Sequence, residues 1–97
     1  MPIDDGTAIS YTALPTGVPV YDSAEAEVGT LRKVLDNARE HIFDGIEVER
    51  RDGVLVFVDA PEVARTAERG VTLTITGEEL DAYPPVKGTV KRRLFGR

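Results

Sequence analysis

The 97-residue sequence contains no cysteine, one histidine and only two serines. Without cysteine the chain has no disulfides and no thiolate for catalysis or zinc binding, which suits a reducing compartment. Ser10 and Ser23 fall in segments predicted as arm and turn, and neither lies in a nucleophile-elbow motif. His41 is predicted to be a half-solvated loop residue. We therefore expect no catalytic residues and no enzyme activity.

Long apolar runs, phosphate-binding loops and metal-binding spacings are absent too. The longest apolar run, 54–58, is far shorter than the ~20 residues of a membrane-spanning helix. The N-terminus lacks the basic and apolar regions of a signal peptide. Neither GxGxxG nor GxxxxGK[ST] occurs, and the acidic residues do not follow EF-hand spacing. The sequence predicts a cytoplasmic protein with no cofactor, no metal site and no membrane span.

Charge is distributed unevenly along the chain. All 17 acidic residues lie at or before Asp81, together with seven of the 12 basic ones, which gives residues 1–86 a net charge of −10 and the last eleven residues +5. An acidic body repels phosphate backbones and anionic lipids, so nucleic acid is expected to bind only through the tail. The candidate partner-binding residues are Lys87, Lys91, Arg92, Arg93, Leu94, Phe95 and Arg97.

The basic tail, 85–97, has several interpretations. It is equally compatible with a solubilising end, with a clamp on the acidic body, and with an interaction segment. In the last case the basic side chains bind phosphate or an acidic partner, and Leu94 and Phe95 act as apolar anchors. The segment from Val86 onward is also compatible with strand addition to another chain's sheet edge.

Several short strands are predicted before residue 60. "VPVYD" at 18–22 is a strand candidate, and Ile46 and Val48 alternate with glutamates as in a strand with one solvated face. "RRDG" at 50–53 predicts a hairpin turn in which Gly53 adopts a positive φ. The run 54–58 is apolar at every position, so we expect a central, well-covered strand there.

The second half begins with a helix signal. Asp59 followed by Glu62 resembles a capping box, so a turn or two of helix is expected within 59–70. The alternation in 71–76 predicts a strand with Val71, Leu73 and Ile75 facing inward. Thr76 and Glu79 then have capping-box spacing, and Pro84 and Pro85 follow the short helix predicted there.

The segment "VGTLRKVLDNAREHI", 28–42, is ambiguous. Apolar residues at 24, 28, 31, 35, 38 and 42 follow the spacing of an amphipathic helix. Gly29 would cost about 1 kcal/mol relative to alanine inside a helix, and Asp36-Asn37 is a turn-prone pair. Periodicity alone slightly favours the helix, with a strand as the alternative.

The order of "GVPVYDSAEAEVGTLRKVL", "IFDGIEVER" and "GVLVFVDAPEVARTAERGVTL" resembles the PRC-barrel family, specifically its small stand-alone bacterial members. Family members have a strand, an acidic turn, "(I/V)G-x-(L/V)" opening the next strand, a hairpin and a final "V-x-L" strand. The resemblance covers about residues 14–80, although "DSAEAE" lacks the glycine that many members have in this turn. It implies a strand over 28–35, bulged near Lys33, and a loop over 37–42.

The fold expected from this resemblance is a small β-barrel of five to six antiparallel strands with one or two short helices. It would comprise an extended N-terminal arm at 1–13, a PRC-barrel-like domain at 14–84 and the basic tail. The implied function is a non-enzymatic interaction or scaffold module that binds a protein partner or itself, as a homodimer. The alternative is an RNA- or ribosome-associated factor that uses the tail.

Overall fold

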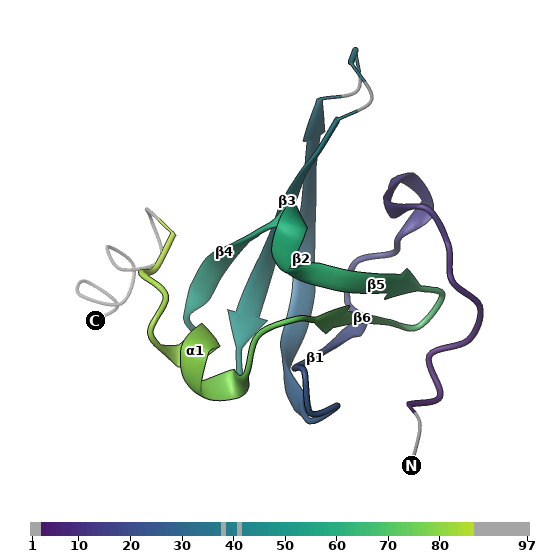
Figure 1. Cartoon of the computed structure of the whole chain (residues 1–97). Coiled ribbons are helices and arrows are strands. Elements are labelled where there is room, and N and C mark those ends of the chain that lie inside the picture. Colours follow the sequence, from purple (N-terminus) through teal and green to yellow (C-terminus); the bar gives the residue numbers. More distant parts are fainter. Residues whose placement is uncertain (1–2, 38, 41, 87–97) are drawn as a thin grey trace.

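The computed structural model describes residues 3–37, 39–40 and 42–86, which form a mainly β fold around one six-stranded sheet (Figure 1). The prediction of a mainly β fold with short helices is therefore confirmed. The strands are β1 Pro19–Tyr21, β2 Glu27–Asn37, β3 Ile42–Arg50, β4 Leu55–Asp59, β5 Val63–Ala67 and β6 Gly70–Leu73. The helical elements are the 3₁₀ helices η1 Tyr11–Ala13 and η2 Ala60–Glu62 and the α-helix α1 Gly77–Asp81.

The strand order in the sheet is β4-β3-β2-β1-β6-β5. Strands β1 to β4 form an antiparallel meander, and the β5–β6 hairpin joins on the other side of β1. Val20 of β1 lies beside Val71 of β6 in a parallel pair, so the prediction of antiparallel strands throughout is wrong at this position. The two edge strands, β4 and β5, are consecutive in the chain and joined only by η2, which requires the sheet to curl (Figure 1).

The ambiguous segment forms a strand, as the resemblance implied. Strand β2 spans Glu27–Asn37, and its register with β3 shifts between Leu31 and Lys33, where a bulge was expected. Gly29 is buried against β3, and a Cβ built on it would lie 2.5 Å from the Glu49 carbonyl oxygen. The glycine that argued against a helix is thus required by close strand packing. The predicted loop is shorter than expected, because β3 already begins at Ile42.

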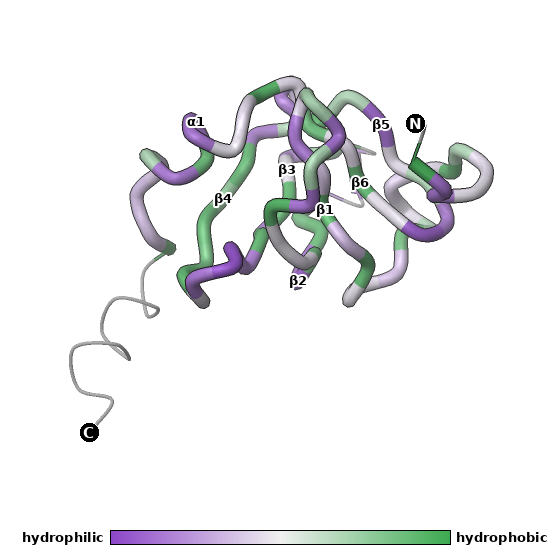
Figure 2. Tube along the Cα trace, turned by 90° about the horizontal axis from the view of Figure 1, so that it is seen from below, coloured by the Kyte–Doolittle hydropathy of each residue, from purple (hydrophilic) through white to green (hydrophobic). Residues whose placement is uncertain are grey.

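The apolar run at 54–58 lies at the edge of the sheet, so the prediction of a central strand is wrong. Val56 and Val58 are fully buried, whereas Leu55 and Phe57 on the opposite face are half-buried. Figure 2 shows the strongly apolar character of β4 along most of its length. Its outer edge is partly covered, because the Val86 N–H donates to the Leu55 carbonyl at 2.7 Å. Local covering by Val86 therefore takes the place of a neighbouring strand at this position.

Where a turn or two of helix was predicted within 59–70, the structure forms one turn of 3₁₀ helix, η2, and then mainly strand. The Asp59 side chain caps nothing, η2 ends at Glu62, and β5 follows immediately. Residues from Val63 onward pair with β6, with Thr66 beside Val71 and Ala67 beside Gly70. Pairing with β6 satisfies backbone groups that a short exposed helix would leave to water, so tertiary structure overrides the local capping signal.

Both of the other local signals are confirmed. Gly53 has a φ of 89° in the turn between β3 and β4, and its N–H donates to the Arg50 carbonyl at 2.9 Å. Thr76 and Glu79 form a reciprocal capping box at the start of α1. This helix buries Leu80 in the core, and Val71, Leu73 and Ile75 face inward as predicted. The buried core consists of Leu14, Val20, Leu31, Ile46, Val48, Val56, Val58, Val71, Leu73, Ile75 and Leu80.

The N-terminal segment lies along the outer edge of β5. The Ile9 N–H donates to the Thr66 carbonyl at 3.0 Å, and the Glu68 N–H donates to the Thr7 carbonyl at 3.0 Å. Arg65 holds the nearly buried Asp5 carboxylate through two hydrogen bonds of 2.8 and 3.1 Å. These contacts cover the second edge of the sheet.

Candidate functional site

The hairpin of β2 and β3 extends well beyond its neighbours. Strand β1 pairs with β2 only as far as Thr30, and the Val18 carbonyl accepts a further hydrogen bond from the Leu31 N–H. On the other side, β4 pairs with β3 only from Gly45 onward. Residues 32–37, 39–40 and 42–44, here called the ribbon, therefore project from the molecule as two strands (Figure 1). The outer edge of β2 from Arg32 to Asn37 is paired with no strand among the described residues.

Two features shape the ribbon locally. Its register shifts twice, between Leu31 and Lys33 and between Leu35 and Asp36, and such irregularities increase strand twist. At the tip, the Asn37 side-chain oxygen accepts hydrogen bonds from the backbone N–H groups of Arg39 and Glu40 at 3.1 and 3.3 Å. Asparagine commonly forms this type of turn.

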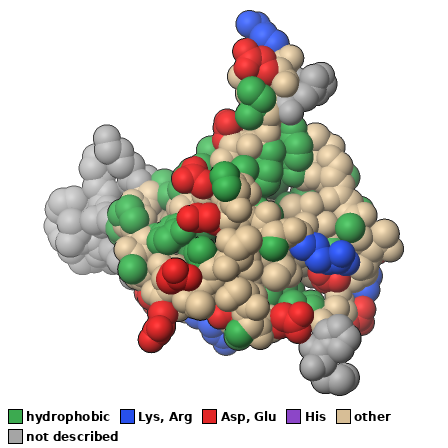
Figure 3. Space-filling model, in the orientation of Figure 1, with side chains coloured by type: hydrophobic (Ala, Val, Ile, Leu, Met, Phe, Trp, Pro, Cys, Tyr) green, Lys and Arg blue, Asp and Glu red, His purple; other side chains and the backbone are tan. Residues whose placement is uncertain are grey.

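Apolar side chains line both faces of the ribbon. Val34 and Leu35 are half-buried, and Ile42 is 46% exposed. The ring of Phe43, which pairs with Asp36 near the tip, stacks on that of Tyr11 in η1, with centroids 4.7 Å apart and planes inclined by 18°. Figure 3 shows hydrophobic side chains along this projection and charged side chains at its tip.

The strand register assigns these residues to faces. Val34 pairs with the buried Ile46 and therefore lies on the inner face, whereas Leu35 pairs with Gly45 on the outer face. The ring of Phe57 lies over Gly45 and extends this outer apolar surface onto β4. An isolated two-stranded hairpin is marginally stable in water, so a ribbon of this composition would be stabilised by a further strand.

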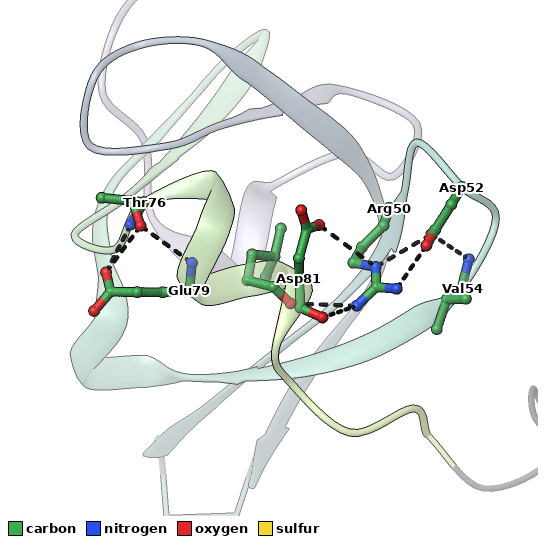
Figure 4. Close-up of polar contacts among 7 residues, drawn as sticks. Arg50, Asp52, Val54, Thr76, Glu79 and Asp81 are labelled. Atoms are coloured by element: carbon green, nitrogen blue, oxygen red, sulfur yellow. Dashed lines mark hydrogen bonds and ion pairs between the residues drawn. The ribbon is translucent and has the colours of Figure 1, made fainter.

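A polar cluster surrounds Arg50, whose side chain is only 11% exposed (Figure 4). Its guanidinium donates to both carboxylate oxygens of Asp52, at 3.1 and 2.6 Å, and to the Asp81 carbonyl at 2.9 Å. The hydrogen bond with Asp52 raises the pKa of Arg50 above its usual value. Arg50 thus satisfies carbonyls at the C-terminus of α1 and fixes the helix to the β3–β4 turn.

Shallow depressions of about 320 and 570 Å³ border this cluster, and Arg50 and Arg51 line both of them. Arg50 is paired with Asp52, and Arg32, which lines the smaller depression, is paired with Glu49 at 2.6 Å. Carboxylates therefore neutralise two of the three arginines, and the exposed Arg51 is the cation that these two ion pairs leave unneutralised.

The buried carboxylates also have structural roles. Burial opposes ionisation of Asp22, but hydrogen bonds donated by the N–H groups of Ala26, Gly77 and Ala24 outweigh it and lower its pKa. The hydrogen bonds from Arg65 lower the pKa of Asp5. A general acid or base near neutral pH requires a raised carboxyl pKa, so both shifts run against such a role.

The seven tail residues predicted to bind a partner, and His41, lie outside the described residues. Within residues 3–37, 39–40 and 42–86, no cluster of three or more His, Asp or Glu side chains is arranged to hold a metal ion. In the same part of the chain, no helix has the length and apolar character needed to cross a membrane.

Sequence reasoning identified β2, its bulge and the loop after it, but missed the projection of the ribbon. A usable signal was present: the strand predicted at 28–35 is longer than the strands predicted at 18–22 and 54–58. A hairpin whose strands exceed their neighbours in length must project from the sheet. No protein-family model matches the chain, and no curated protein matches it at a significant level.

Proposed function

We propose that this protein is a non-enzymatic interaction module of the PRC-barrel type that binds a protein through its ribbon. The order and spacing of strands, acidic turn and hairpin support the family part of the proposal. The absence of cysteine is compatible with the bacterial cytoplasm that the family resemblance suggests.

The unpaired outer edge of β2 is the observation that carries the proposed function. Along residues 32–37, the backbone donors and acceptors that do not bond to β3 face outward, next to the apolar side chains of Val34 and Leu35. Exposed sheet edges recruit strands from other chains through main-chain hydrogen bonds, and neighbouring side chains add specificity. The other sheet edges are partly covered, β5 by the N-terminal segment and β4 by Val86.

Site-specific photocrosslinking in living cells tests this proposal. A photoreactive residue at Leu35 is expected to give covalent adducts with protein, whereas the same residue at the exposed Glu78 of α1 is not. An Ile42→Asp substitution in the Leu35 probe protein should reduce the adduct while leaving the circular dichroism spectrum unchanged. Equal crosslinking from both positions, or no protein adduct at Leu35, would contradict the proposal.

The charge division along the sequence favours a second candidate, an RNA- or ribosome-associated factor that binds through the basic tail. Five cationic residues follow an acidic body of net charge −10. Four or five tail contacts to a single strand should give a salt slope of about −3 in log–log form. Deletion of residues 87–97 should abolish binding, and undiminished binding would exclude this candidate.

A further inference from the structure

We propose that the outer edge of β5 is a second protein-binding site, and that the N-terminal segment occupies it as an intramolecular ligand. The ligand class is an extended segment of another protein with an aspartate four residues before an apolar side chain, as Asp5 precedes Ile9 in this chain. This inference goes beyond the proposed function, because it concerns a different edge of the sheet from that of β2.

The N-terminal segment binds β5 in the manner of an added strand. The Ile9 N–H donates to the Thr66 carbonyl at 3.0 Å. On the other side of Ala8, the Thr7 carbonyl accepts a hydrogen bond of the same length from the Glu68 N–H. Thr7 and Ala8 are themselves exposed, so main-chain bonds account for most of their attachment. These are the contacts by which a peptide of another protein joins a sheet edge.

Arg65 supplies the selectivity of this edge. Its guanidinium donates to both carboxylate oxygens of Asp5, at 2.8 and 3.1 Å, and to the Gly6 carbonyl at 2.8 Å. A planar guanidinium recognises a carboxylate specifically in this two-point geometry. The Asp5 side chain is 7% exposed, whereas 42% of the Arg65 side chain is exposed. When the segment leaves, water therefore reaches both charges, and Arg65 is free to bind another carboxylate.

The edge of β5 extends further than the N-terminal segment covers. The segment follows β5 only as far as Ile9, because Ser10 caps η1 and the chain turns away. Strand β5 continues to Val63, and beside it lies a depression of about 190 Å³ that is also lined by Tyr11 and Phe43. A segment that stays extended would place an apolar side chain in this depression. These additional contacts help it to displace a tethered segment, which otherwise benefits from a high effective concentration.

Fluorescence anisotropy of two labelled peptides titrated with the full chain tests this site. The short peptide has the sequence of residues 3–9, and the long peptide continues with Thr-Val-Thr, which maintains strand alternation. The protein variant Asp5→Ala weakens the intramolecular contact and leaves Arg65 available. Apparent affinity rises with the fraction of molecules whose site is open, so the long peptide should bind this variant about tenfold more tightly than it binds the wild type. It should also bind about fivefold more tightly than the short peptide, because it reaches the depression.

Matched variants identify the contacts responsible. Asp4→Ala, which removes an exposed ion pair with Arg69, should leave the affinity within about twofold of the wild type. Adding Arg65→Ala to Asp5→Ala should abolish binding, as should alanine in place of the second aspartate of the long peptide. Ile42→Asp, in the ribbon, should leave peptide binding unchanged. Circular dichroism of every variant establishes that its fold is retained.

Each outcome bears on a separate part of the inference. Equal affinity of the long peptide for the wild type and Asp5→Ala, or no binding to either, would overturn the site. Binding that survives the loss of Arg65 would overturn recognition of the aspartate, and equal affinities of the two peptides would overturn the contribution of the depression. Crosslinking at Leu35 measures the β2 edge independently, so failure of either proposal leaves the other intact.

Discussion

Asp22 connects two segments that are far apart in the sequence. Its carboxylate accepts hydrogen bonds from the turn that follows β1 and from the Gly77 N–H at the start of α1. It is almost fully buried, so these donors have no equivalent partner once the side chain is removed. One residue thereby fixes both the turn and the position of the helix.

Asp22→Ala is expected to lower the free energy of unfolding by about 2–4 kcal/mol, measured by urea denaturation. The folded-state pKa is lowered, so this stabilisation is complete above the ordinary aspartate pKa of about 4 and is lost as the pH falls through the folded value. The difference between Asp22→Asn and the wild type should therefore shrink below pH 4. Asp59→Ala is the control, since that exposed side chain caps nothing. Equal losses for both alanine variants would argue against the role of Asp22.

Tyr83 should titrate later than an ordinary tyrosine. Burial, together with the hydrogen bond that its hydroxyl donates to Glu62, raises the pKa of Tyr83 to about 12. Because the folded state keeps this proton longer than the unfolded state, the corresponding stability is lost as the pH rises above 10. Ultraviolet titration of wild type and Tyr83→Phe should differ by one phenol ionising near pH 12. A phenol that ionises near pH 10 in this comparison would disprove the prediction.

At the scale of secondary-structure elements, β2 illustrates the limit of periodicity. Its apolar residues follow helical spacing, yet β2 pairs with β1 and β3. Only three of the six apolar positions in that pattern, Val28, Leu31 and Leu35, lie in β2, and the bulge near Lys33 changes which face the later residues occupy. A chance alignment of strand, bulge and turn residues therefore imitates a helix.

Gly29→Ala distinguishes the two structures by the sign of its effect. In a helix this substitution would stabilise the protein by about 1 kcal/mol. In the observed strand, the new Cβ meets the Glu49 carbonyl oxygen and the Val48 side chain, so we expect destabilisation by about 1–3 kcal/mol. Thermal or urea unfolding measures the change. A more stable Gly29→Ala protein would contradict the packing of β2 against β3.

The sequence contained enough information to predict the elements that depend on local chemistry. The turn at Gly53, the capping box of α1 and the inward-facing residues of β6 all follow from neighbouring residues. It did not contain enough for β5 or for the edge position of β4, since both depend on which distant strand lies alongside. The unequal lengths of the predicted strands pointed toward the ribbon, but its extent depends on where β1 and β4 stop pairing.

At the scale of the whole molecule, the N-terminal segment is attached along the outer edge of β5. Asp5 is nearly buried and paired with Arg65, whereas the neighbouring pair of Asp4 and Arg69 is exposed. Removing one partner of a charge pair lowers the stability of the protein much more when the pair is buried than when it is exposed. Among the charged contacts of this segment, the Asp5–Arg65 pair is therefore expected to contribute most to its attachment.

Arg65→Ala should detach this segment by leaving the Asp5 carboxylate unpaired. A loss of about 2 kcal/mol in local stability corresponds to roughly 30-fold faster hydrogen exchange at the amides of Ile9, Glu68 and Arg69, which bond across this contact. Arg69→Ala, which removes an exposed pair, should change these rates less than threefold. Comparable acceleration in both variants would show that the buried pair has no special role.

The parallel pair of β1 and β6 has a consequence for the time course of folding. Val20 and Val71 are far apart in the chain, whereas β2, β3 and β4 are joined by short turns. Closing a long loop before its contacts form is slow, so we expect the meander to acquire protection first in pulse-labelled refolding. β1 would then stay unpaired on its β6 side until the β5–β6 hairpin arrives, and the N-terminal segment would dock last. Simultaneous protection of all six strands would contradict this sequence of events.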